Sequence, residues 1–212
     1  MPTRLPALAD LASALRHTEG PITEHWSEVN QHFQDWVGQP GLRAELKGYL
    51  SGLSSAEYAA LINSSRETTT HFAWCLRAEK DDPFSVWLHE YKPRQDWREG
   101  YADSVHNHRY HFCTNIISGA YTHERFTAAL DGAGSGINSV TLLRSTVCPA
   151  GTGGFLLADE FHRIPSAEDG TMTLLVKSRE LRSWSLSYDP TTHHSYQHIP
   201  VENRFDELAD RL

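Results

Sequence analysis

The sequence has no apolar run long enough to span a membrane, and its 212 residues include only three cysteines. Positive charge is also scarce, because 19 Lys and Arg against 27 Asp and Glu give a formal net charge of −8. Such a balance argues against binding to nucleic acids or to anionic membrane surfaces. Cys75, Cys113 and Cys148 show no pairing pattern, and Met1–Pro6 lacks the apolar segment of a signal peptide. We therefore expect a cytoplasmic protein.

The chain contains no internal repeat and no low-complexity tract, and its length fits one domain. In the first third, apolar residues recur three and four positions apart, which is the period of an amphipathic helix. Ser54 and Glu57 have the spacing of a capping box, which predicts a further helix start. We predict a helical segment over residues 1–67, packed on the rest of the chain. The clearest apolar stripe consists of Ile22, Trp26, Val29, Phe33 and Val37.

The remaining residues, 68–212, are rich in β-branched and aromatic residues in short runs separated by Gly, Asp, Asn and Ser. Short strands at fairly regular spacing predict an antiparallel sandwich or barrel. The predicted fold class is therefore mostly β, a double-sheet (jelly-roll) barrel with N-terminal α-helices. The predicted strands are Phe84–Tyr91, Phe112–Ile117, Tyr121–Phe126, Val140–Leu143, Gly154–Leu157, Thr171–Lys177 and Trp184–Tyr188.

Two histidines, His106 and His108, stand one residue apart on a segment predicted to be extended, so their side chains point the same way. With 13 histidines in the chain, about 0.8 such pairs are expected by chance, so the pair indicates a metal site only together with the residues around it. His162 supplies a third imidazole on a later apolar segment. By contrast, His193 and His194 follow Asp-Pro-Thr-Thr, which predicts a solvated turn.

Three neutral imidazoles on one face of a β-scaffold form a site for a divalent transition metal. The set His106, His108 and His162 contains no carboxylate, so a bound ion keeps its full 2+ charge. A six-coordinate Fe(II) would have three positions left for a bidentate substrate and dioxygen. The same three ligands also suit Zn with one water, and the sequence leaves Fe, Zn, Ni and Mn open.

The segment around this pair resembles the first motif of the cupins, which form small double-sheet barrels with a metal in the mouth. Gly100, His106, His108 and Gly119 match that motif, whereas its Glu position falls on Phe112 or Cys113. A second, weaker match consists of the glycines at 151, 153 and 154 followed by His162.

Within the cupins, the stretch from His108 to Cys113 resembles the cysteine dioxygenase-like (thiol dioxygenase) group, which lacks the Glu and carries a Cys at this spacing. Phe155–Ile164 resembles the stretch that delivers the third His of that group. The resemblance implies that Arg77 pairs with a substrate carboxylate, and that Cys113 lies beside the metal. The residues themselves leave simpler interpretations open, namely an apolar filler for Cys113 and a surface ion pair for Arg77.

The chain departs from that group on the strand after the third His. Lys177 and Arg179 stand where the group has a His and a Tyr. In members of the group that Tyr supports oxygen chemistry, and this chain lacks it at that position. Tyr188 or Tyr110 could take its role. If Lys177 or Arg179 points inward, the site would favour an anionic substrate.

Two functions follow as expectations. The first is a non-haem iron dioxygenase that acts with O2 on a small amino acid or thiol-bearing carboxylate. In this enzyme Fe(II) is held by His106, His108 and His162. The substrate is bound by Arg77 and Arg179, and the catalytic residues are Cys113 and Tyr188. The alternative is a redox-silent lyase or isomerase that uses Zn, Ni or Mn on a small carboxylate.

Overall fold

The computed structural model describes residues 6–18, 20–200, 208 and 211. Four helices precede the strands, and the Ser54 side chain and Glu57 form the predicted capping box at the start of the fourth. No helix of the described residues is long and apolar enough to cross a membrane. The helices are α1 (Pro6–Arg16), α2 (Trp26–Val37), α3 (Leu42–Ser51) and α4 (Ser55–Ser64).

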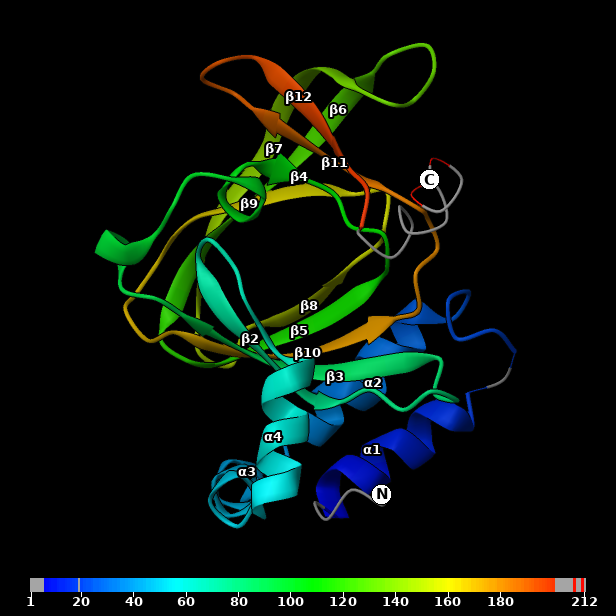
Figure 1. The fold of residues 1–212 in the computed structure, drawn as a ribbon, viewed down its shortest axis with the longest axis vertical. Coiled ribbons are helices and arrows are strands. Elements are labelled where there is room, and N and C mark those ends of the chain that lie inside the picture. Colours follow the sequence, from blue (N-terminus) through cyan, green and yellow to red (C-terminus); the bar gives the residue numbers. More distant parts are fainter. Residues whose placement is uncertain (1–5, 19, 201–207, 209–210, 212) are drawn as a thin grey trace.

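Two six-stranded antiparallel sheets face each other (Figure 1). The first sheet has the order β1 (Arg66–Glu67), β2 (His71–Arg77), β3 (Phe84–Tyr91), β10 (Met172–Ser178), β5 (Phe112–Ser118), β8 (Gly153–Leu156). The second has the order β12 (His194–His198), β11 (Ser185–Asp189), β4 (Val105–His106), β9 (Phe161–Ala167), β6 (Ala120–Leu130), β7 (Ile137–Pro149). The predicted fold class, a double-sheet barrel with N-terminal helices, is confirmed.

The helices cover the outer face of the first sheet, and the main hydrophobic core lies between them (Figure 1). Side chains alternate along each strand, so one set faces the helices and the other faces the second sheet. Val86, Cys113 and Val176 lie side by side in the sheet and belong to the helix-side core. Their neighbours Thr114 and Leu175 face the space between the sheets. This inner face supplies one wall of the candidate site.

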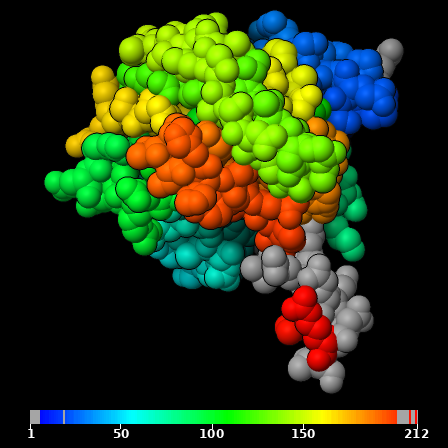
Figure 2. Space-filling model, turned by 90° about the horizontal axis from the view of Figure 1, so that it is seen from above, coloured from blue at the N-terminus to red at the C-terminus, as the bar shows by residue number. Residues whose placement is uncertain are grey.

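The opposite face of the molecule is formed by the β6–β7 hairpin, yellow-green in Figure 2, and by β11 and β12, in orange. A small core that includes Val105, Phe161 and Tyr188 packs on this side of the second sheet. His193 lies in the turn before β12, as predicted, whereas His194 is the first residue of that strand.

The chain passes from the second sheet to the first between His106, the end of β4, and Phe112, the start of β5. After β5 it turns back at Gly119, whose φ of 74° is in the left-handed region that favours glycine. A Cβ at this position would also lie 2.4 Å from Thr171 Oγ1. The tight turn therefore requires the glycine that the sequence places there.

Candidate metal centre

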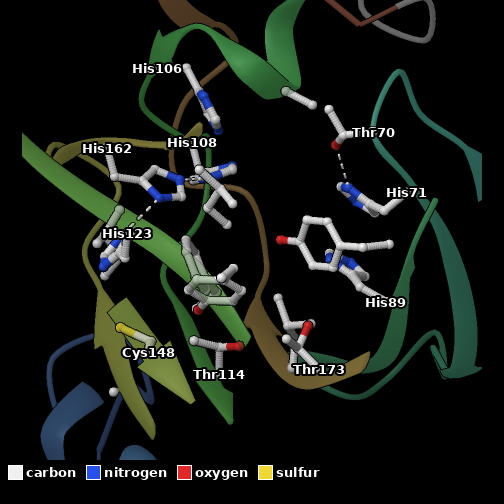
Figure 3. Close-up of a pocket in the computed structure, with 18 of the residues that line it drawn as sticks. Thr70, His71, His89, His106, His108, Thr114, His123, Cys148, His162 and Thr173 are labelled. Atoms are coloured by element: carbon white, nitrogen blue, oxygen red, sulfur yellow. Dashed lines mark hydrogen bonds between the residues drawn. The ribbon is translucent and has the colours of Figure 1, made fainter. Parts of the chain in front are cut away.

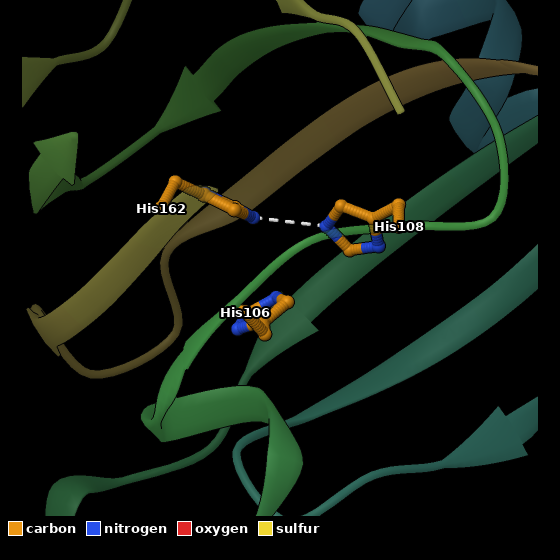
Figure 4. A group of neighbouring side chains, drawn as sticks. All are labelled: His106, His108 and His162. Atoms are coloured by element: carbon orange, nitrogen blue, oxygen red, sulfur yellow. Dashed lines mark hydrogen bonds between the residues drawn. The ribbon is translucent and has the colours of Figure 1, made fainter. Parts of the chain in front are cut away.

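His106, His108 and His162 converge at one wall of the space between the sheets (Figure 4). His106 ends β4, His162 lies directly opposite it on β9, and His108 follows in the crossing segment. One ring nitrogen from each lies within 4.8 Å of the other two. The shortest separation, 2.9 Å, joins His108 Nε2 and His162 Nε2. The structure thus brings together all three histidines predicted from the sequence.

This arrangement fits a transition ion. Imidazole nitrogens about 2.1 Å from one ion lie about 3 Å apart when they occupy adjacent octahedral positions, and the His108–His162 separation matches that value. His106 Nδ1 lies 2.9 Å from the carbonyl oxygen of Ser104 and must donate a proton to it. The lone pair of His106 is therefore on Nε2, where it is free to bind a metal.

A fourth histidine supports the cluster from behind. His123, on β6, lies with its Nε2 3.1 Å from His162 Nδ1 (Figure 3). If His162 binds a metal through Nε2, its Nδ1 carries the proton and donates to His123. Partners of this kind fix the tautomer and orientation of a metal-binding imidazole. No spacing pattern in the sequence marks His123, because its partnership depends only on the pairing of β6 with β9.

Burial keeps these imidazoles neutral. Desolvation lowers the pKa of His106 to about 4 and that of His123 to about 4. The same cause holds the pKa values of His108 and His162 well below the ordinary value of 6.5, and neighbouring histidines add to the effect. A neutral imidazole offers a lone pair at pH 7, so burial prepares the three residues for metal binding.

The cluster lines a cavity of about 460 Å³ between the two sheets. Figure 3 shows His106, His108, His123 and His162 on one wall and a stacked pair, His71 and His89, on the other. No Asp or Glu lines this cavity among the described residues, although the whole chain is acidic. The cations that line it are Arg66, Arg125, Arg144 and Lys177.

Two predicted catalytic residues do not lie in this cavity. Cys113 is fully buried among apolar side chains on the helix side of the first sheet, so the interpretation as an apolar filler fits its position. Its placement beside the metal is wrong, because Phe112 and Thr114, its neighbours in the strand, take the inward positions. Tyr188 pairs with Val105 and packs in the core beyond the second sheet, where its hydroxyl is 2.9 Å from His193 Nδ1.

The two predicted substrate-binding arginines also lie elsewhere. Arg77 forks onto one carboxylate oxygen of the buried Asp82, with its Nε at 2.8 Å and an Nη at 2.6 Å. A bulge in β2 between Cys75 and Arg77 puts Arg77 opposite Val86, on the helix side. Arg179 donates to the backbone carbonyls of the β2–β3 loop, among them Asp82 at 2.7 Å. Neither arginine reaches a substrate in the cavity.

Three inward residues were not predicted as site residues. The sequence left the orientation of Lys177 open, and in the structure Lys177 is 3% exposed and lines the cavity. A signal was present, because Lys177 follows three consecutive apolar residues in a strand that is buried on both faces. The rings of His71 and His89 stack with centroids 4.3 Å apart, and no local pattern marks this pair, which meets only across β2 and β3.

No protein-family model and no curated protein matches the chain. Among solved structures, it is similar to a single-residue variant of the oxalate decarboxylase of Bacillus subtilis, with 18% identity and a TM-score of 0.35, over 56% of this chain and 28% of that one. It is also similar to KdgF from Halomonas sp. (10% identity, TM-score 0.36, 54% of this chain, 86% of that one). Ectoine synthase from P. lautus gives 13% identity and a TM-score of 0.36, over 57% of this chain and 73% of that one. These neighbours are cupin-fold proteins.

Proposed function

We propose that the protein is a mononuclear metal-dependent enzyme that acts on a small carboxylate, with Fe(II)-dependent oxygenation of an amino acid or related acid as its first candidate reaction. The observation that carries this proposal is the convergence of His106, His108 and His162 at the wall of a cavity. The three cysteines are unpaired and buried, which is consistent with the reducing cytoplasm expected from the sequence.

When bound, an iron ion would supply a Lewis acid and a one-electron donor to dioxygen. The chain itself supplies the environment. The three histidines, neutral through burial, would hold the ion and leave its 2+ charge uncompensated. Phe112, whose ring centroid is 4.9 Å from that of His108, covers one side of the cluster together with Leu156. These apolar walls exclude water from the reacting atoms and strengthen electrostatic contacts made there.

The charge of the cavity supports an anionic substrate. The described lining contains three arginines, the amine of Lys177 and no carboxylate, so an acidic molecule enters a favourable potential. Arg125 is paired with Glu160, but no acid enters the cavity itself among the described residues. Several tyrosines line the cavity, and Tyr110, whose ring stacks 5.2 Å from that of His108, is a candidate for oxygen chemistry in place of Tyr188.

A redox-silent metal enzyme is the second candidate. It is favoured by the positions of Cys113, Tyr188 and Arg77, which would serve thiol oxidation but lie outside the cavity. A Zn, Ni or Mn ion on the same three histidines would polarise a carboxylate substrate without dioxygen.

The two candidates separate in one experiment. Untagged protein is purified without added metal, analysed for metal, and then stripped and reloaded anaerobically with Fe(II), Zn, Ni or Mn. Each form is tested for O2 consumption with a panel of amino acids and thiol carboxylates, with His162→Ala as the control. We expect the Fe(II) form to consume O2 only when substrate is present. Anaerobic turnover by the Zn or Ni form, with no O2 uptake by the Fe(II) form, would replace the oxygenase with the redox-silent enzyme.

A further inference from the structure

The amine of Lys177 is buried in the wall of the cavity that holds the candidate metal ligands. In β10, Thr173, Leu175 and Lys177 point inward because alternate residues of a strand face the same side. Lys177 is 3% exposed, and its Nζ has no hydrogen-bond partner in the described part of the chain. Lysines are almost never fully buried without a partner, because a desolvated ammonium is costly. A buried lysine without a partner is typical of a binding site in which the ligand supplies the group that pairs with the amine.

Two aromatic rings lie against the amine. Its Nζ lies 4.1 Å from the centroid of the Trp87 ring and 5.3 Å from that of Tyr110. The guanidinium of Arg66 lies 5.4 Å from the same Trp87 ring. Cation–π contacts offset part of the desolvation cost, but two cations gathered at one indole repel each other. Burial first, and the charge of Arg66 second, hold the pKa of Lys177 well below its ordinary value.

The acidic residues on this side of the barrel are paired with other cations. Glu180 accepts from Arg109 at 2.7 Å, and Glu67 accepts from Lys92 at 2.5 Å. Since no Asp or Glu lines the cavity in the described part of the chain, the protein provides no carboxylate for Lys177 there. An acidic ligand in the cavity would supply the missing counter-ion and keep Lys177 charged.

Lys177 is one side chain away from the histidine cluster. The ring of Tyr110 lies 5.2 Å from that of His108 and 5.3 Å from Lys177 Nζ, so it stands between them. Phe112 pairs with Lys177 across the sheet and places its ring 4.9 Å from that of His108. A small molecule bound at the cluster therefore has Lys177 within reach of its far end.

We propose that Lys177, with Arg66 beside it, binds a second acidic group of the substrate. The metal-bound end would carry the first donor group, so the substrate class is a small dicarboxylate or an amino acid with an acidic side chain. The metal end rests on the proposed function, whereas the anion subsite rests on Lys177 and its surroundings alone.

The test compares two four-carbon probes, succinate and butyrate, which differ by one carboxylate. Their dissociation constants are measured by calorimetry on metal-free and Zn-loaded protein, for the wild type and for Lys177→Met, which keeps the length of the side chain and removes the charge. Lys47→Met, an exposed residue of α3, is the matched control. We expect succinate to bind the Zn-loaded wild type and Zn-loaded Lys47→Met about tenfold more tightly than butyrate, because a charge-assisted hydrogen bond is worth that much. In Lys177→Met the ratio falls to about one.

A ratio near one in the Zn-loaded wild type, or a ratio that Lys177→Met leaves unchanged, overturns the proposal. In the metal-free protein either probe can place one carboxylate at Lys177, so an equal affinity of wild type and Lys177→Met for succinate overturns it as well. Thermal unfolding adds a second readout, because removal of a buried amine without a partner raises the melting temperature, whereas loss of a structural lysine lowers it. If Lys177→Met does not fold, Lys177→Gln gives the same comparison without charge. A protein that takes up no metal refutes the proposed function, while the metal-free arm still decides whether the anion subsite exists.

Discussion

His123 and His162 are joined nitrogen to nitrogen, with His123 Nε2 3.1 Å from His162 Nδ1. This contact turns Nε2 of His162 toward His108, whose Nε2 is 2.9 Å away. We expect His123→Ala to lower metal affinity about 10–100-fold, the usual effect of losing the partner of a metal-binding imidazole. Competitive titration with a chelating dye measures the change. His123→Gln, whose amide oxygen can accept from His162, should retain more affinity than His123→Ala, and equal losses in both would contradict the orienting role.

Metal binding should require all three candidate ligands. Replacing His106, His108 or His162 with Ala removes one of three donors, so metal content after dialysis should fall sharply while the circular dichroism of the fold remains. His193→Ala and His194→Ala serve as controls, because His193 lies in the turn before β12, His194 is the first residue of that strand, and neither lines the cavity. Near-full metal occupancy in His162→Ala would remove that residue from the ligand set.

Arg77 should affect stability instead of substrate binding. Its side chain and that of Asp82 are both buried, and Arg16 holds the other oxygen of the same carboxylate at 2.5 Å. Removing one partner of a buried ion pair costs about 3–5 kcal/mol. Arg77→Ala should therefore lower the free energy of unfolding, measured in urea, by an amount of that order. A calorimetric dissociation constant for succinate that rises in the stable variant Arg77→Lys would restore the substrate-binding role.

The fold and the histidine cluster could be predicted because both depend on short-range patterns. Apolar residues three and four apart mark α2, and runs rich in β-branched and aromatic residues mark β3 and β5. His106 and His108 are close in sequence and lie near the end of one strand, so their spacing correctly predicted that their side chains lie together. His162 was singled out by its apolar flanks and by the resemblance to a known family, and it lies directly opposite His106.

The misplaced residues depend on features that spacing does not reveal. Between His108 and Cys113 the chain crosses from one sheet to the other, so the direction of the first side chain does not determine that of the second. A single bulge in β2 turns Arg77 to the helix side. His123 meets His162 only through the register of β6 with β9. Each of these positions is set by long-range pairing.

Cys113 should behave as a core residue. It is fully buried against the helix-side cluster, and burial raises the pKa of its thiol, so it has no reactive thiolate at pH 7. Cys113→Ser places a hydroxyl among apolar side chains, which costs about 1–3 kcal/mol. We expect a lower melting temperature with unchanged metal content and unchanged O2 uptake per folded molecule. A loss of O2 uptake in a variant of normal stability would return Cys113 to the reaction.

Acid should destabilise the metal-free protein through its buried histidines. Burial lowers the pKa of His71 to about 3, and Lys177 adds a smaller effect. The unfolded chain takes up a proton near pH 6.5, so between about pH 6.5 and about pH 3 the unfolded state binds a proton that the folded state excludes. The stability that such a histidine contributes is therefore fully present above pH 6.5. Below that pH the free energy of unfolding falls by about 1.4 kcal/mol per pH unit for each such histidine.

The contribution of His71 can be isolated by substitution. Urea unfolding of chelator-treated protein at pH 7.5, 6.5, 5.5 and 4.5 gives the slope for the wild type and for His71→Gln. Gln keeps a polar group for the Thr70 hydroxyl, which lies 2.9 Å from His71 Nδ1, but does not titrate. Below pH 6.5, the slope of the variant should be smaller by about 1 kcal/mol per pH unit. His194→Gln, at an exposed position, should keep the wild-type slope. Identical slopes in all three proteins would show that His71 is already protonated in the folded state, and that the cavity is more open to water than its burial indicates.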